Sequence, residues 1–157
     1  MSPPHTAPHI RTANAADVAR LAEFNCAMAL ETEGLVLNPV IVRAGVARLI
    51  ANPALGCYRV AECGGKVVAC VLVTTEWSDW HNCHYWWIQS VYVSPAHRRQ
   101  GVFRALYQAV LAAARTNGEV ASLRLYVEQD NQRAQFTYQQ LGMTPSHYRV
   151  FEQKLQP

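Results

Sequence analysis

Arginines and a glycine mark the predicted start of a helix in the stretch from Trp86 to Leu106, WWIQSVYVSPAHRRQGVFRAL. β-Branched and aromatic residues predict a strand that Ser94-Pro95 ends, and apolar residues at helical spacing follow Gly101. A helix N-terminus presents unpaired N–H groups and a positive dipole end, and a glycine lets an anion approach the backbone. The segment 98–104 therefore predicts a site for a phosphate-like anion. A strand-to-helix turn with solvated arginines is the alternative.

A tyrosine and an asparagine share one face of a later predicted helix. In VEQDNQRAQFTYQQLGM, which begins at Val127, residues 131, 134, 138 and 141 lie on the same face. Tyr138 lies about 10 Å along the helix axis from Asn131 at the standard rise per residue. An unperturbed phenol is protonated at neutral pH and can act as a general acid. Tyr138 is therefore a candidate catalytic residue, with a core aromatic as the alternative. Asn131 also suits a helix N-cap.

The elements that position these residues are predicted in the order β-α-α-β-β-β-α-β-α-β. Predicted strands cover residues 9–12, 57–63, 66–76, a segment ending at 93, 122–127 and 147–155, and residues 77–83 form a loop. Helices are predicted from Asn14 to Gly34, from Asn38-Pro39 to Asn52-Pro53, from 102 to 117 and from 131 to about 141. Gly64-Gly65 predicts a hairpin, and the later strand–helix–strand crossover predicts a parallel pair. The fold class is α/β (α+β), with a central mixed, mostly antiparallel sheet flanked by helices.

These features together resemble the GNAT (GCN5-related) N-acetyltransferase family. The segment from Arg98 to Phe103 is similar to its motif A, R/Q-x-x-G-x-G/A, with Phe103 where the family usually has Gly or Ala. The later helix resembles motif B, N-x-x-A-x-x-x-Y-x-x-x-G-F, which Asn131, Ala134, Tyr138 and Gly142 match while Met143 replaces Phe. The predicted element order is also that of the family. The resemblance covers nearly the whole chain, so we expect a single domain over 1–157, with 1–8 as a flexible Pro-rich tail.

The resemblance implies an enzyme that transfers the acetyl group of acetyl-CoA to a primary amine by direct attack in a ternary complex. The strand backbone near Val91 and Val93 would bind the pantetheine arm, and the backbone from Arg98 to Phe103 the pyrophosphate. Tyr138 is the implied general acid. The residues implied in cofactor binding are Val91, Tyr92, Val93, Arg98, Arg99, Gln100, Gly101, Val102, Phe103, Arg104 and Asn131.

The acceptor and the general base are less defined. The segment AMALETEGLVLNP resembles the acceptor region of polyamine-type and similar small-amine relatives. Glu31 and Glu33 could attract a cationic amine or be ordinary charges at a helix end. Gln89 stands where many relatives have a strand Glu; it cannot titrate but could order a water molecule, so it is only a substrate-contact candidate. The base stays unassigned, with Glu76, Asp79, His81 and His84 as further alternatives.

Composition excludes several other classes. With 157 residues, half of them hydrophobic, and a net charge of +3, one ordered domain is expected, without the Lys/Arg stripe of a nucleic-acid binder. Five cysteines without C-x-x-C spacing favour the cytoplasm, and no apolar run reaches membrane-spanning length. His81, Cys83 and His84 lack a fourth ligand at standard spacing, so no metal is expected.

A homodimer is a hypothesis from the fold and the aromatic residues. An acyl-CoA-binding module without catalysis and a peptide-amine acetyltransferase are the alternative functions.

Overall fold

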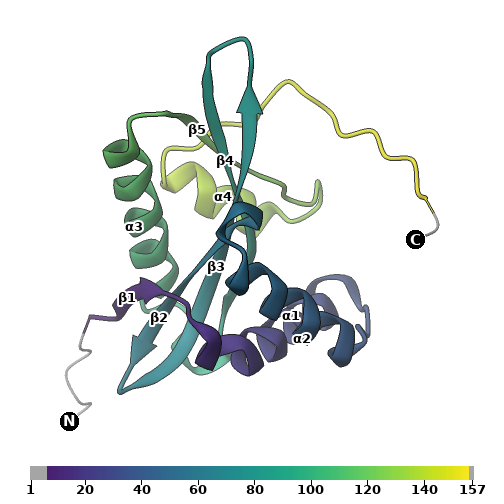
Figure 1. The fold of residues 1–157 in the computed structure, drawn as a ribbon, viewed down its shortest axis with the longest axis vertical. Helices are drawn as coiled ribbons and strands as arrows, with labels where there is room; N and C mark the ends of the chain where they lie inside the picture. The colour runs from purple at the N-terminus through teal and green to yellow at the C-terminus, as the bar shows by residue number, and fades with distance from the viewer. Residues whose placement is uncertain (1–6, 156–157) are drawn as a thin grey trace. The chain divides into compact units, whose positions relative to one another are not determined.

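Within residues 7–155, which the computed structural model describes, the chain forms one five-stranded sheet and four α-helices (Figure 1). The strands are β1 His9–Thr12, β2 Cys57–Cys63, β3 Lys66–Ser78, β4 Cys83–Val93 and β5 Val120–Leu125, in that spatial order. The helices are α1 Val18–Glu33, α2 Pro39–Ala51, α3 Val102–Asn117 and α4 Gln132–Gln140. Only β4 and β5 run parallel, which confirms the predicted mixed, mostly antiparallel sheet.

The chain divides into two compact units. The first ends at Tyr126 and contains the whole sheet with α1, α2 and α3. The second begins at Val127 and contains α4 and the C-terminal segment. The anion-site candidates therefore belong to the first unit, and Asn131 and Tyr138 belong to the second.

The local sequence sets the helix ends as predicted. Asn14 and Asp17 form a reciprocal capping box before α1, and Gly34 ends that helix with φ +64°. The Asn38 side chain accepts from the Val40 N–H at the start of α2, and Pro39 occupies the first turn, where its missing N–H costs nothing. Gly118 ends α3 with φ +74°. Each helix end depends on contacts within a few residues of the chain, so the residue types alone predict it.

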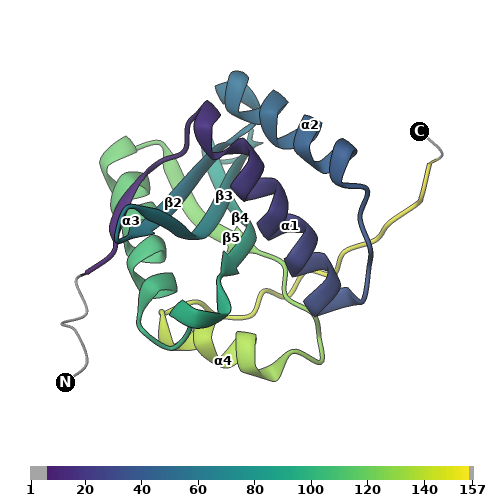
Figure 2. The ribbon, with the colours of Figure 1, turned by 90° about the horizontal axis from the view of Figure 1, so that it is seen from below.

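Two helical layers cover the sheet of the first unit. Figure 2 shows α1 and α2 on one face of the sheet and α3 on the opposite face. Leu21, Phe24 and Val46 bury their side chains against the sheet below α1 and α2, and Leu106 and Val110 of α3 are fully buried. Burial of such side chains contributes about 1.5–3 kcal/mol each. None of the helices in residues 7–155 is both long and apolar enough to cross a membrane.

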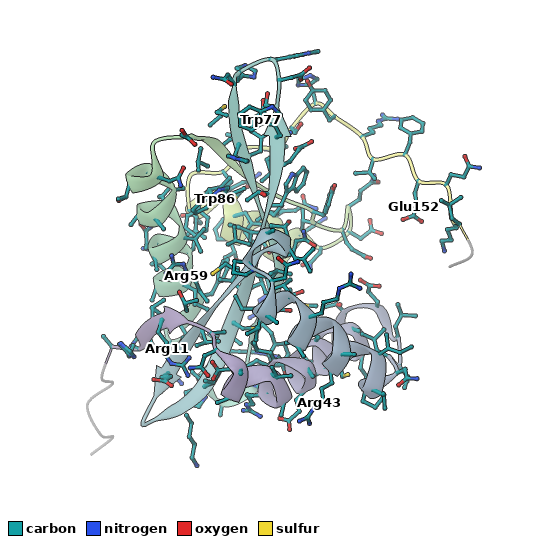
Figure 3. All side chains as sticks on the ribbon, viewed as in Figure 1. Arg11, Arg43, Arg59, Trp77, Trp86 and Glu152 are labelled. Atoms are coloured by element: carbon teal, nitrogen blue, oxygen red, sulfur yellow. The ribbon has the colours of Figure 1, made fainter. Side chains whose placement is uncertain are left out.

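Three predicted segments differ from the structure: one strand is absent, one loop is shorter and one strand begins earlier. The strand predicted at 147–155 is wrong, because that segment has no regular secondary structure and pairs with no strand in the described part of the chain. The loop predicted at 77–83 is shorter, since Trp77 and Ser78 pair with His84 and Cys83 and lengthen the β3–β4 hairpin (Figure 3). The Trp77 and His84 rings meet edge to face at 4.9 Å, a cross-strand contact that supports the extension.

The strand predicted at 122–127 starts two residues earlier, at Val120, where the parallel pairing with His84 begins. Most of the predicted N-terminal tail, residues 1–6, lies outside the described residues.

Candidate functional site

Strand β4 changes its pairing near its C-terminal end. Gln89 pairs with Leu72 of β3, and the next described pair joins Tyr92 to Cys70. Two residues of β4, Ser90 and Val91, therefore stand opposite a single residue of β3. Ser90 has φ +47°, a conformation that costs a non-glycine residue of order 1 kcal/mol or more. On the other side, the pairing of β4 with β5 ends at Ile88. Residues 89–93 therefore lie beyond the described ladder with β5, and this edge can pair with an extended ligand.

The connection from β4 to α3 forms a concave backbone turn. Arg99 has φ +62° and Gly101 has φ +78°, and such left-handed residues turn successive N–H groups toward one point. Gly101 is the N-cap of α3 and has no side chain that could accept from the N–H groups of the first turn, and a Cβ added there would meet nothing within 4 Å. Val102 buries its side chain and fixes the start of the helix. The first turn of α3 is thus an exposed, uncapped helix N-terminus that suits a phosphate.

Arg98 is bound to α1 and to the backbone of β4. Its guanidinium donates to Glu31 Oε2 at 2.7 Å and to the Val93 carbonyl at 2.9 Å. Glu31 also accepts from the Tyr92 hydroxyl at 3.0 Å. The Arg98 hydrogen bond, opposed by burial, holds the pKa of Glu31 below its usual range. The structure therefore brings three predicted site residues together, with Arg98 and Glu31 paired to each other.

The other predicted residues of the first unit differ in their exposure. The side chains of Arg99 and Arg104 are exposed, and that of Gln100 donates to the Ala96 carbonyl at 2.9 Å. The Phe103 ring is half-buried, 6.3 Å from that of Tyr107. Gln89 is exposed and donates to Thr74 Oγ1.

The second unit holds the two motif B residues on α4. Asn131 Oδ1 accepts from the Ala134 N–H at 3.0 Å, which confirms the predicted N-cap role. Tyr138 is half-buried, and burial raises the pKa of its hydroxyl. The phenol therefore stays protonated well beyond neutral pH, as a proton donor requires.

A pocket of about 440 Å³ lies between α1, α2 and the sheet, within the first unit. At its polar side, Asn25 Nδ2 donates to the Tyr58 hydroxyl at 2.9 Å, and Ser90 is also hydrogen-bonded to that hydroxyl. Burial raises the pKa of Tyr58. Asn25 Oδ1 is buried and has no hydrogen-bond partner among the described residues. Sequence reasoning missed Asn25 and Tyr58, because they stand 33 positions apart in a helix and a strand and only the fold joins them.

The histidine-rich end of the hairpin has its own contacts. His81 Nδ1 lies 3.1 Å from Ser78 Oγ and 3.0 Å from the Tyr85 hydroxyl. Within residues 7–155, no three His, Cys, Asp or Glu side chains are grouped so that they could hold a metal ion.

Comparisons with known proteins agree with this architecture. The model of the acetyltransferase (GNAT) family matches residues 30–143. A possible acetyltransferase from Clostridium difficile 630 shares 36% identity, with a TM-score of 0.91 over 97% of this chain and 100% of that one. The chain belongs to the GNAT acetyltransferase family and is an acyltransferase. The comparison with curated proteins found no match.

Two more distant structures share the fold alone. A predicted acetyltransferase with acetyl-CoA from Clostridium acetobutylicum is 16% identical, with a TM-score of 0.75 over 93% of this chain and 96% of that one. A ribosomal-protein-alanine N-acetyltransferase from Brucella melitensis biovar Abortus 2308 is 15% identical, with a TM-score of 0.77 over 96% and 100% of the two chains. GNAT enzymes use acetyl-CoA.

Proposed function

We propose that this enzyme transfers the acetyl group of acetyl-CoA to a primary amine of a small molecule in a ternary complex. The observation that carries the proposal is the continuous backbone from residue 89 to Gly101. It leaves the β5 ladder after Ile88, bulges at Ser90 and ends at the uncapped N-terminus of α3. An extended pantetheine arm joined to a pyrophosphate fits these two features in that order.

The residues of the turn fit the pyrophosphate. The N–H groups at the start of α3 would bind it, and open space at Gly101 allows close approach. Arg99 and Arg104 would add exposed positive charge, while Arg98 would act mainly by holding the turn against Glu31. The main chain of Val91 and Val93 would bind the pantetheine arm, although the Val93 carbonyl already accepts from Arg98.

Acetyl-CoA supplies an activated thioester. The acceptor nitrogen, once it has lost a proton to solvent or to a base, attacks the thioester carbonyl carbon. A C–N bond forms, and the attached nitrogen loses its surplus proton to solvent. The C–S bond breaks, Tyr138 gives its proton to the departing thiolate and is reprotonated from solvent, and the products are an N-acetyl amine and CoA. A main-chain N–H near the β4 bulge would stabilise the oxyanion. Gln89 cannot titrate, and no side chain is assigned as the base.

Calorimetry of the full chain with acetyl-CoA tests the proposal. We expect micromolar binding and, in a separate assay, release of CoA thiol that depends on an added amine. If the protein does not bind acetyl-CoA, the proposed function is wrong. If it binds acetyl-CoA but releases no CoA with any primary amine, the chain is a binding module without catalysis.

Glu31 and Glu33 provide a matched pair for acceptor recognition. Glu31→Gln is expected to leave the KM for the amine unchanged, because Glu31 is paired with Arg98 and Tyr92 and does not line the pocket. Since the ion pair is largely exposed, its loss should cost about 0.5 kcal/mol or less in a urea denaturation. Glu33→Gln, which changes a pocket residue, is expected to raise the KM. A rise for Glu31→Gln instead would assign Glu31 to the acceptor.

Other parts of the functional assignment stay predictions from the sequence: a single domain over 1–157, a cytoplasmic location and a homodimer.

A further inference from the structure

The Arg98 side chain lies on the edge of β4 that the proposed pantetheine arm uses. The Ser94 N–H donates to the Val68 carbonyl of β3 at 2.8 Å. The Val93 carbonyl belongs to the same planar trans peptide, so it points the opposite way, toward the edge that pairs with β5 only as far as Ile88. Arg98 Nε donates to this carbonyl at 2.9 Å. The guanidinium therefore stands on the cofactor side of the strand.

Two residues hold the guanidinium in this position. Glu31 Oε2, near the C-terminal end of α1, accepts from Arg98 Nη2 at 2.7 Å. The Tyr92 hydroxyl donates to Glu31 Oε1 at 3.0 Å and so orients the carboxylate. Tyr92 is buried, and its ring lies 4.9 Å from that of Phe24 in α1. The fold thus fixes the carboxylate of Glu31 beside Arg98.

The pair between Arg98 and Glu31 ties the turn before α3 to α1, whereas the local shape of the turn rests on its own backbone. The Arg98 N–H donates to the Pro95 carbonyl at 3.3 Å. Arg99 and Gly101 have left-handed backbone conformations, which turn the N–H groups toward the anion site. The main effect of Glu31 on an anion bound there is therefore electrostatic, because it pairs with a positive charge that the anion could otherwise use.

Arg98 is near enough to the start of α3 to reach a phosphate bound there. It precedes Gly101 by three residues, which span at most about 11 Å of chain. The side chains of Arg98 and Glu31 are 39% and 41% exposed, so the guanidinium can move without crossing a packed interior. A phosphate can accept two parallel hydrogen bonds from Arg, but Nε and Nη2 are already engaged by the Val93 carbonyl and Glu31.

We infer that Glu31 weakens acetyl-CoA binding by withholding Arg98 from the cofactor phosphates. The inference rests on the proposed function and assigns Glu31 to the cofactor site, as a positioning residue that acts through Arg98. Product CoA carries the same phosphates as acetyl-CoA. Glu31 therefore also favours the release of CoA, a step that limits turnover in many enzymes.

Calorimetric titration of the full chain with acetyl-CoA and with CoA tests the sign of this effect. At about 0.15 M salt, exposed charges more than about 8 Å apart are largely screened. Glu31→Gln is expected to lower both Kd values at least about threefold, because it frees the guanidinium and keeps a side chain of similar size. Glu23→Gln is the control, since it removes another exposed α1 carboxylate that pairs with Arg20 instead, and both Kd values should change less than about twofold.

An Arg98→Gln background separates the withholding of Arg98 from direct repulsion by Glu31. If Glu31 acts through Arg98, adding Glu31→Gln to Arg98→Gln should change the Kd less than about twofold. Equal tightening in both backgrounds would mean that Glu31 repels the phosphates directly. That result, or an unchanged or higher Kd in Glu31→Gln alone, would overturn the inference. Thermal unfolding checks that each variant folds.

The wild-type titration distinguishes this inference from the proposed function. If the wild-type protein does not bind acetyl-CoA, the proposed function is refuted and the inference falls with it. If the wild-type protein binds and Glu31→Gln binds no more tightly, only the role of Glu31 is wrong.

Discussion

Tyr138→Phe is expected to lower kcat by roughly 10²–10⁴-fold, the usual contribution of a positioned general acid. The change removes one hydroxyl and keeps the ring, so the half-buried side chain still fills its site. The Kd for acetyl-CoA should stay within about threefold of the wild-type value, because the proton is needed only as the thiolate leaves. Steady-state release of CoA thiol gives kcat, and calorimetry gives the Kd.

The pH dependence adds a second readout for Tyr138. Burial raises the pKa of its hydroxyl above the ordinary value of about 10, so the phenol stays protonated through the neutral range. Activity of the wild-type enzyme should therefore show no loss due to this group through the neutral range, and a loss due to it should appear only at a higher pH than for an unperturbed phenol. Tyr148→Phe is the control, since it removes a hydroxyl from an exposed tyrosine in the same unit. A kcat of Tyr138→Phe equal to that of the control would assign the proton to another donor.

Gly101→Asp is expected to weaken acetyl-CoA binding by at least about 100-fold. The introduced carboxylate would stand at the N-cap of α3, where it can accept from the N–H groups that the pyrophosphate needs and repel its negative charge. The same capping bond would offset part of the strain that a side chain meets at φ +78°, so the protein should still fold. Calorimetric titration with acetyl-CoA measures the loss.

Gly118→Asp is the matched control for that variant. Gly118 lies at the opposite end of the same helix, also has a positive φ of +74°, and has open space around an added Cβ. The charge and the backbone strain are therefore similar, but no anion is expected to bind at a helix C-terminus. Equal weakening by both variants would mean that net charge or stability, rather than the turn at Gly101, controls binding.

The element order, the helix caps and the two family motifs could be read from the residues alone. Each depends on chemistry within a few positions: Asn38-Pro39 starts a helix, Gly64-Gly65 turns a hairpin, and Gly101 permits a left-handed turn. The segment 147–155 shows where such reasoning ends. Its composition suits a strand, but a strand exists only where a neighbour completes its hydrogen bonds, and that neighbour is not encoded locally.

Some side-chain roles could likewise be predicted from the sequence, whereas others depend on the tertiary structure. The sequence by itself determined the family, and it predicted both the binding of the cosubstrate at the turn and the candidate acid, because these follow from residue types at short spacing. Tertiary structure alone decided that Arg98 pairs with Glu31, and that Asn25 meets Tyr58 at the end of an apolar pocket. Contacts between residues so far apart in the chain depend on how helices pack on the sheet, and side-chain packing is settled only when the whole core is assembled.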